Sequence, residues 1–329
     1  METLNMKFPP TVHSRKVLTT FIWLLLLNLS LHQGNGLPYM TSDVQKVSGK
    51  SFDYIIVGGG TVGCPLATTL SEKFTVLLVE RGGTPYDDPL VIEKKKYGFS
   101  LIQTDEFSSV AQSFISKDGV SNLRGRVLGG SSAINGGFYS RASEDFVKKA
   151  GWDDELVNEA YRWVESRVVF TPQLTPWQTV AKFGFLEAGI QPYNGFSLEH
   201  IEGTKVGGTV FDERGKRHTS ADLLEAGNPK NIMVLLNTTV KNIIIDTNRK
   251  GNETRVRGIR FIKSDGSSSS PQILLLSGIG PHEHLKKFNI SVNVGLEGVG
   301  DGMQDNPSIS VLADTMPAKR QPYAPSLWA

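Results

Sequence analysis

The sequence predicts an α/β fold, in which a Rossmann-like parallel sheet carries an added antiparallel meander. Two observations predict this. Between residues 53 and 80, an apolar run, a glycine-rich turn, a helix-length segment and a second apolar run follow one another, which is the order of a strand–helix–strand unit. Between residues 232 and 262, three closely spaced β-branched runs favour antiparallel strands joined by short turns.

The turn of the first unit has the spacing G-x-G-x-x-G, with Gly58, Gly60 and Gly63. Glycines there permit a tight turn, a close approach of the backbone to a pyrophosphate, and close packing of the helix on the strand. The helix that follows directs backbone N–H groups and its positive dipole end at phosphates. Glu80 closes the second run about 20 residues later, where an acid accepts hydrogen bonds from a ribose. The unit therefore predicts dinucleotide binding, but it does not distinguish NAD from FAD. The alternative interpretation is a glycine-rich turn between a strand and a helix that binds no ligand.

A second glycine-rich stretch covers residues 124–141. Gly129 and Gly130 permit close backbone approach to a flat or anionic ligand. Ser131 and Asn135 supply hydrogen-bonding side chains. Apolar residues alternate with these glycines, which favours an anchored loop over a flexible surface loop.

Taken together, the two stretches resemble the glucose–methanol–choline (GMC) oxidoreductases, a family of FAD enzymes. The resemblance is carried by residues 58–63, by Glu80 and Arg81, and by residues 125–135. The variant Gly-Arg-Val-Leu-Gly-Gly-Ser-Ser, with the residues at 138–142 after it, looks most like the plant branch, which contains HOTHEAD-like proteins and (R)-mandelonitrile lyases. The resemblance therefore implies FAD, which the first motif alone leaves open.

The resemblance also implies which residues hold FAD. Thr61 and Val62 are expected at the pyrophosphate and Glu80 at the ribose. Arg81 is expected beside the adenine end, which the backbone of Val240 contacts. The remaining expected cofactor-binding residues, at the phosphates and the flavin, are Gly58, Gly60, Gly63, Val127, Gly130, Ser131, Asn135, Gly136 and Phe138.

The same resemblance divides the chain into segments. The FAD-binding domain is expected at 50–150 and again at 216–300, with a substrate-domain segment at 151–215 between them. Residues 301–329 are expected to be a truncated start of the rest of the substrate domain and a tail, so that this second domain is incomplete. Near 267–270 a serine run stands where the family has a further strand of the parallel sheet; losing such a strand costs on the order of several kcal/mol of apolar burial.

No residue of the sequence matches the catalytic histidine of the family or its His or Asn partner. His282 and His284 follow the second family signature and are expected at the start of a surface helix. His218 precedes a predicted helix N-cap at Thr219 or Ser220 and is expected to be structural. We therefore expect no catalytic residue and no metal site in this chain.

The leading hypothesis is an FAD-binding GMC oxidoreductase acting on CH–OH groups, in a truncated form that is inactive or impaired. In the family, a hydride passes from an alcohol carbon to the flavin while a histidine removes the hydroxyl proton. One alternative is a hydroxynitrile (mandelonitrile) lyase-like protein with non-redox FAD; another is a non-enzymatic truncated isoform or gene-model fragment. The implied substrate is a small alcohol or cyanohydrin. The net charge of +2 lacks the strong basic excess that is typical of nucleic-acid-binding proteins.

The N-terminus has the pattern of a secretory signal peptide over residues 1–36. Basic residues precede a short apolar run at 17–29, and small and polar residues follow. The run is shorter than the roughly 20 residues that span a bilayer. We expect a secreted, extracellular protein without a stable membrane span after signal removal; the alternative is a membrane protein held by an uncleaved signal anchor.

Secretion agrees with three N-glycosylation sequons beyond the expected signal peptide, at Asn237, Asn252 and Asn289. Asn237 follows a predicted strand and is expected to be the least accessible of the three. Cys64 is the single cysteine, so no internal disulfide is possible. It lies on the helix of the first unit, where a small apolar packing role is expected.

Overall fold

The computed structural model describes residues 36–105, 108–116, 119–247, 254–263 and 270–302. The expected signal peptide, the expected C-terminal tail and most of the serine run lie outside these residues. The chain separates into a unit Met1–Gly36 and a unit Leu37–Ala329, and every helix and strand of the described residues belongs to the second unit. Within those residues, no helix is both long enough and apolar enough to cross a membrane.

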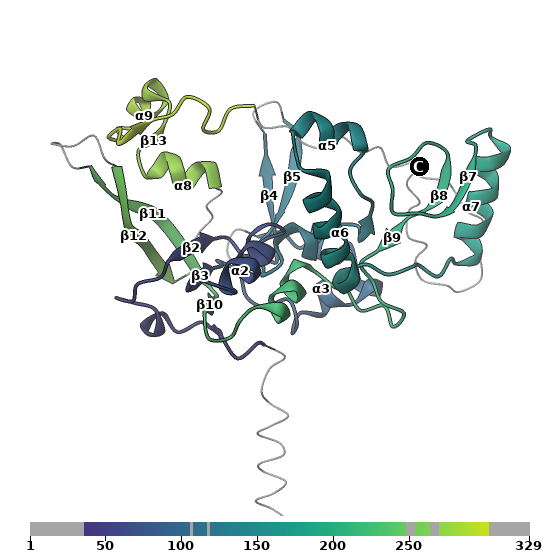
Figure 1. Cartoon of the computed structure of the whole chain (residues 1–329), viewed down its shortest axis with the longest axis horizontal. Coiled ribbons are helices and arrows are strands. Elements are labelled where there is room, and N and C mark those ends of the chain that lie inside the picture. Colours follow the sequence, from purple (N-terminus) through teal and green to yellow (C-terminus); the bar gives the residue numbers. More distant parts are fainter. Residues whose placement is uncertain (1–35, 106–107, 117–118, 248–253, 264–269, 303–329) are drawn as a thin grey trace, which may run out of the picture. The chain divides into compact units, whose positions relative to one another are not determined.

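A parallel sheet of four strands organises this unit (Figure 1). Its order is β1 (Met40–Thr41), β10 (Ile232–Leu235), β3 (Val76–Val79) and β2 (Tyr54–Val57). Every neighbouring pair is parallel, so the predicted parallel sheet is confirmed. All four residues of β3 are buried, as in a parallel strand that is covered on both faces.

The two faces of the sheet belong to two apolar clusters, because successive side chains of a strand point to opposite faces. On one face, Val76 and Leu78 pack with Cys64 and Ala67 of helix α2 (Gly63–Ser71). On the other face, Leu77 and Val79 pack in a cluster that also contains Leu235, Val240 and Ile273. Helix α2 thus covers the first face directly after the glycine turn.

The antiparallel part is a two-stranded hairpin of β11 (Thr238–Thr247) and β12 (Thr254–Lys263). The apolar run at 232–236, which we expected to be the first strand of a three-stranded meander, instead contains the inner strand β10 of the parallel sheet. Asn237, with a positive φ of 52°, turns the chain between β10 and β11. A short apolar run without alternation fits either position, so its sequence does not distinguish them.

The stretch from 86 to 121, for which the sequence shows no clear period, contains short elements and a hairpin. These are α3 (Pro89–Ile92), η2 (Lys94–Lys96), α4 (Phe99–Ile102) and the antiparallel pair β4 (Ala111–Ile115) and β5 (Ser121–Gly125). Beyond residue 151 the chain forms the longer helices α6 (Asp154–Val168) and α7 (Pro176–Glu187). Side chains cap both N-termini, with Thr175 and Gln178 forming a reciprocal capping box on α7.

The remaining elements are short. They are η1 (Val44–Lys46), η3 (Gly130–Ala133), β6 (Phe138–Tyr139), α5 (Glu144–Ala150), β7 (Tyr193–Phe196), β8 (Thr204–Val206), β9 (Gly208–Thr209), η4 (Ser220–Ala226), α8 (Ser270–Leu276), β13 (Ile279–Gly280), α9 (His282–Lys287) and β14 (Val294–Gly295). Strand β2 is at the edge of the parallel sheet, and no described strand pairs with its outer side.

Candidate functional site

A cavity of about 380 Å³ lies at the carboxyl ends of β2 and β3. Ligands of open α/β sheets bind at this edge, where the loops after the strands converge. Several of the residues expected at FAD line it, namely Gly58, Gly60, Thr61, Glu80, Arg81, Gly130, Ser131 and Val240.

The first glycine turn packs so closely at Gly63 that a side chain is excluded there. A Cβ added at Gly63 would lie 1.9 Å from the backbone oxygen of Gly58. Gly58 itself has φ of +98°, a conformation that residues with a Cβ rarely adopt. The turn therefore brings the start of α2 directly to the end of β2.

The second glycine-rich loop lies against the first. The Gly129 N–H donates to the Gly59 oxygen at 2.7 Å. A Cβ added at Gly130 would lie 2.7 Å from the Gly60 Cα, and one at Gly125 would lie 2.3 Å from the Gly130 backbone. The two motifs, separate in the sequence, therefore form one backbone-lined cradle.

Glu80 joins the first glycine turn to the residues that follow β3. It is 5% exposed, and its two carboxylate oxygens accept from the Gly59 N–H and the Gly82 N–H, each at 2.8 Å. Burial raises the pKa of Glu80, an effect that these two backbone donors oppose. Both oxygens already have a donor, so the structure gives Glu80 a structural task besides the expected contact with a ribose.

The wall of the cavity beside Glu80 is positively charged. Arg81 donates from Nη1 to Oε1 of Gln112 at 2.6 Å, and the Arg124 guanidinium lies 4.9 Å from the centre of the Phe114 ring. Burial lowers the pKa of Arg81; Glu80 opposes this shift, and the nearby Arg126 and Arg124 add to it. Clustered cations at a concave surface attract anionic groups such as phosphates.

Sequence reasoning missed part of this wall. Phe114, Arg124 and Gly125 come from the β4–β5 hairpin. The dipeptide Asp118-Gly119 between two short runs is a hairpin signal that predicts it. The other lining residues that were not expected are Val57, Val79, Thr238, Thr239, Pro271 and Ile273.

Other residues expected at the cofactor do not line this cavity. Val62 is 74% exposed at the N-cap of α2. Gly63, the first residue of α2, packs against the Gly58 backbone instead of lining the cavity. Val127 is buried in a cluster with Val91 and Ala133. Their contact with FAD remains a prediction.

The last three expected residues lie further along the second loop. Asn135 accepts at Oδ1 from the Gly137 N–H and from Arg217 Nη1, both at 3.0 Å. A Cβ added at Gly136 would lie 3.1 Å from the Phe138 ring. Phe138 is 46% exposed and lines a second cavity. These positions leave their expected role at the flavin as a prediction.

A segment from residue 217 to 222 supports the second loop from behind. Arg217 is 2% exposed and donates to the Val91 oxygen at 3.1 Å and to the Asn135 oxygen at 2.8 Å. Ser220 donates from N to Ser132 Oγ at 3.0 Å and from Oγ to the Gly129 oxygen at 3.1 Å. Arg217 had no expected role from the sequence, since none of its partners is a sequence neighbour.

His218 lies between two acids in the same segment. Its Nδ1 is 2.8 Å from Asp222 Oδ2, and its Nε2 is 3.7 Å from Asp212 Oδ2. The hydrogen bond with Asp222 raises the pKa of His218; burial opposes it, Asp212 adds to it, and Lys216 lowers it. Thr219 caps η4, so the expected N-cap is present.

The raised pKa of His218 makes stability depend on pH. Protonated His218 is favoured in the folded state, so its contribution is complete below the unfolded pKa of about 6.5 and is lost as pH rises through the folded value. We expect the free energy of unfolding to exceed that of His218→Asn by on the order of 1 kcal/mol at low pH, with a smaller gap at higher pH. Urea unfolding of both proteins between about pH 5.5 and 8.5, a range that brackets the unfolded pKa of about 6.5, measures this difference in free energy. A difference that does not change with pH would contradict the prediction.

Cys64 is a buried thiol whose Sγ lies 3.2 Å from the Gly59 oxygen. Burial raises its pKa to about 12, and reactivity requires the thiolate. We expect the folded protein to resist an aromatic disulfide reagent at mildly alkaline pH and the urea-unfolded protein to react fully. Absorbance of the released thiol measures both rates; rapid labelling of the folded protein would contradict the burial.

Two glycine-rich loops that meet over the carboxyl ends of a parallel sheet, beside a cluster of arginines, define an α/β dinucleotide-binding protein. The family profile described as GMC oxidoreductase matches residues 52–308. The chain belongs to the GMC oxidoreductase family, which confirms the expected family; FAD is the cofactor of that family.

Plant proteins are among the similar sequences, in agreement with the expected branch. Protein HOTHEAD of Arabidopsis thaliana is 47% identical over 280 residues, covering 80% of this chain and 47% of that protein. An (R)-mandelonitrile lyase-like protein of the same plant is 44% identical over 328 residues, covering 90% and 59%. (R)-mandelonitrile lyase 3 of Prunus serotina is 42% identical over 300 residues, covering 86% and 52%. The chain therefore spans about half the length of these relatives.

Solved structures agree on the fold. Formate oxidase of Aspergillus oryzae RIB40 superposes with a TM-score of 0.58 at 21% identity, covering 74% of this chain and 50% of that one. Pyridoxine 4-oxidase from Mesorbium loti superposes with a TM-score of 0.56 at 22% identity, covering 74% and 55%. These likenesses confirm the α/β fold class.

Proposed function

We propose that this chain binds FAD in the 380 Å³ cavity and is part of an oxidoreductase acting on CH–OH groups. The observation that carries the proposal is the contact of the two glycine loops, where a Cβ at Gly130 would meet Gly60. Backbone N–H groups at the start of a helix, beside Arg81 and Arg124, suit a pyrophosphate. The residues that line the cavity therefore fit the pyrophosphate and adenosine part of FAD.

The chain's own residues hold and orient the cofactor in this proposal. Gly60 and Thr61, with Gly130 and Ser131 opposite, take the pyrophosphate. The adenosine end lies toward Glu80, Arg81 and Val240, and the flavin end toward Val62, Val127, Asn135, Gly136 and Phe138. Bound FAD supplies the capacity to accept a hydride.

The proposed domain organisation follows from the same assignment. Segments 50–150 and 216–300 form the FAD-binding domain, and the hydrogen bonds of Arg217 and Ser220 to the second loop support joining them. Segment 151–215 belongs to the substrate domain. Residues 301–329 contain the start of the next segment of the same domain.

The test of the proposed function is flavin binding by the purified full chain. We expect visible flavin absorbance near one FAD per chain, directly or after reconstitution. The variant Arg124→Met is expected to weaken FAD binding about tenfold or more, as for a lost charge-assisted contact, while the exposed control Lys230→Met binds as the parent does. Protein that stays colourless after reconstitution would overturn the proposal.

A lyase is the second candidate, favoured by the 42% identity to (R)-mandelonitrile lyase 3. The two reactions differ in their effect on the flavin. Bleaching of bound flavin by an alcohol without oxygen supports oxidation, whereas cyanide release from mandelonitrile with the flavin still oxidised supports lyase action.

We further propose that the protein enters the secretory pathway and carries a glycan at Asn289. Asn289 is exposed just after α9, whereas the Asn237 amide is half-buried and donates to Ser42 Oγ at 3.0 Å. After expression in a secreting host, Asn289→Gln is expected to remove one glycan and Asn237→Gln none, as measured by mass before and after enzymatic deglycosylation. An unchanged mass for Asn289→Gln would contradict this. Asn252 lies outside the described residues.

A further inference from the structure

A second cavity, of about 290 Å³, shares no lining residue with the cofactor cavity. Its apolar wall includes Phe138, Phe185 and Ile190, and its polar groups include Gln178 and two lysines. No aspartate or glutamate is among its lining residues in the described part of the chain. An apolar space with cations and without acids suits an anion that carries an apolar body.

Gln178 presents an unused donor at this cavity. The residue is 8% exposed, and its Oε1 accepts from the N–H and the hydroxyl of Thr175 at 2.9 and 3.2 Å. Its amide nitrogen makes no hydrogen bond to any residue that the structure describes. In the described residues this nitrogen is not among the buried side-chain atoms that lack a partner, so it is accessible and can donate to a ligand in the cavity.

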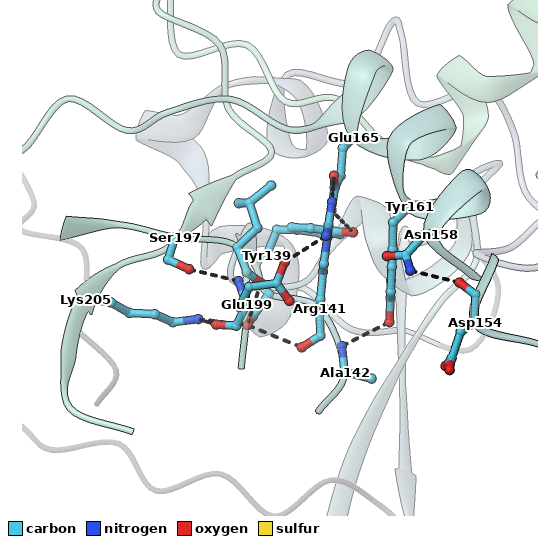
Figure 2. Close-up of polar contacts among 12 residues, drawn as sticks. Tyr139, Arg141, Ala142, Asp154, Asn158, Tyr161, Glu165, Ser197, Glu199 and Lys205 are labelled. Atoms are coloured by element: carbon cyan, nitrogen blue, oxygen red, sulfur yellow. Dashed lines mark hydrogen bonds and ion pairs between the residues drawn. The ribbon is translucent and has the colours of Figure 1, made fainter. Parts of the chain in front are cut away.

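Lys205 is a cation whose acceptors are uncharged. Its Nζ donates to Ser140 Oγ at 3.0 Å and to the main-chain oxygen of Glu199. The Glu199 carboxylate is occupied elsewhere, 2.7 Å from Arg141 Nη1, as Figure 2 shows. Burial lowers the pKa of Lys205, with Glu199 opposing the shift. In the part of the chain that the structure describes, no carboxylate therefore forms an ion pair with Lys205.

Lys182 is a second cation at the cavity. Its Nζ lies 4.5 Å from the Phe183 ring centre and 5.0 Å from the Tyr193 ring centre. Within the described residues it forms no ion pair. Neither ring lines the cavity, whereas Lys182 itself does, so its flexible side chain must turn from these rings to reach a ligand.

A polar framework fixes the wall that carries Lys205. Arg141 forms two parallel bonds with Glu165, Nε to Oε1 and Nη2 to Oε2, each at 2.7 Å. The Tyr139 hydroxyl donates to the same Glu165 at 3.0 Å. Figure 2 shows Arg141 reaching from Glu165 of α6 to Glu199. Such paired bonds hold geometry well, so they fix the segments whose oxygens accept from Lys205.

We propose that this cavity binds a small monocarboxylic acid with a single ring or a short branched chain. The carboxylate lies among Lys205, Lys182 and the Gln178 amide, and the apolar body lies against Phe138, Phe185 and Ile190. The volume of about 290 Å³ equals roughly ten liquid water volumes, which suits one ring and excludes a long chain. The cavity shares no lining residue with the cofactor cavity, and Phe138 is the one residue that both proposals use.

Calorimetric titration of the full chain with phenylacetate tests the site, with the neutral 2-phenylacetamide as its isostere. We expect phenylacetate to bind at least about tenfold more tightly than the amide, with or without added FAD, since charged hydrogen bonds contribute about 1.5–3 kcal/mol. Equal binding of acid and amide, or no binding of the acid at millimolar concentration, overturns the proposal.

Variants connect the binding to these side chains. Gln178→Glu retains the acceptor of the capping box but places a negative charge in the cavity, so we expect thermal stability to be kept and phenylacetate binding to fall about tenfold or more. Lys205→Met is expected to weaken binding similarly, whereas Lys230→Met, an exposed lysine outside the cavity, leaves it unchanged. Parent-like binding by Gln178→Glu and Lys205→Met together overturns the proposal.

Discussion

Replacing Gly63 by alanine is expected to destabilise the protein by about 3 kcal/mol or more and to abolish flavin retention. The added Cβ would lie 1.9 Å from the Gly58 oxygen and 3.1 Å from its carbonyl carbon. These are backbone atoms, so no side-chain rotation relieves the clash. The turn and the start of α2 must separate, which opens the cradle itself.

Two matched variants separate the clash from other effects of alanine. Gly184 lies within α7, where a Cβ meets nothing within 4 Å, so Gly184→Ala is expected to stabilise the protein by about 0.5–1 kcal/mol. A Cβ at Gly60 lies 3.8 Å from the Gly130 Cα; Gly60→Ala should keep the fold and weaken flavin binding, because Gly60 lines the cavity. Urea unfolding and flavin absorbance measure all three, and an unfolding midpoint for Gly63→Ala equal to that of the parent would refute the packing argument.

Replacing Glu80 by alanine is expected to destabilise the protein by about 3–5 kcal/mol. The change leaves the N–H groups of Gly59 and Gly82 without their 2.8 Å acceptor, and each unpaired buried donor costs about 1–3 kcal/mol. Glu80→Gln keeps one acceptor oxygen but sets its NH₂ group against the other donor. It should therefore fall between the parent and Glu80→Ala.

A surface acid provides the control for Glu80. Glu93 pairs with Lys96 at 3.1 Å in an exposed position, so Glu93→Gln is expected to change stability by less than about 0.5 kcal/mol. Chemical unfolding of the flavin-free proteins isolates the structural contribution of Glu80. If Glu80→Ala unfolds with the parent and only its FAD affinity falls, then Glu80 acts on the cofactor alone.

The local parts of the fold were predictable from the sequence. The unit from β2 to β3 is a continuous stretch in which periodicity, glycine spacing and the final acid agree. The position of β10 was not predictable, because Ile232–Leu235 is a short apolar run that fits a hairpin or an inner parallel strand. Its partner strands, β1 and β3, lie far from it in the sequence.

The candidate site likewise contains residues that the sequence predicts and residues whose role depends on contacts between distant segments. The glycines at 58, 60 and 130 could be assigned to a ligand because their lack of side chains is visible in the sequence. The role of Arg217 could not, since its bonds to Asn135 Oδ1 and to the Val91 oxygen span 82 and 126 positions. Glu80 was expected at the cavity, but its bonds to Gly59 and Gly82 depend on a three-dimensional turn that spacing alone does not describe.

The sheet order has a consequence for the time course of folding. Strand β10 lies between β1 and β3, and the Asn231 amide beside it donates to the Ser71 oxygen, 160 positions away. Contacts of such long range slow folding, because a large loop must close before they form. On the ribosome, both glycine loops emerge well before Arg217 and Ser220, which support the second loop. The second loop therefore gains this support only after residue 220 has been synthesised.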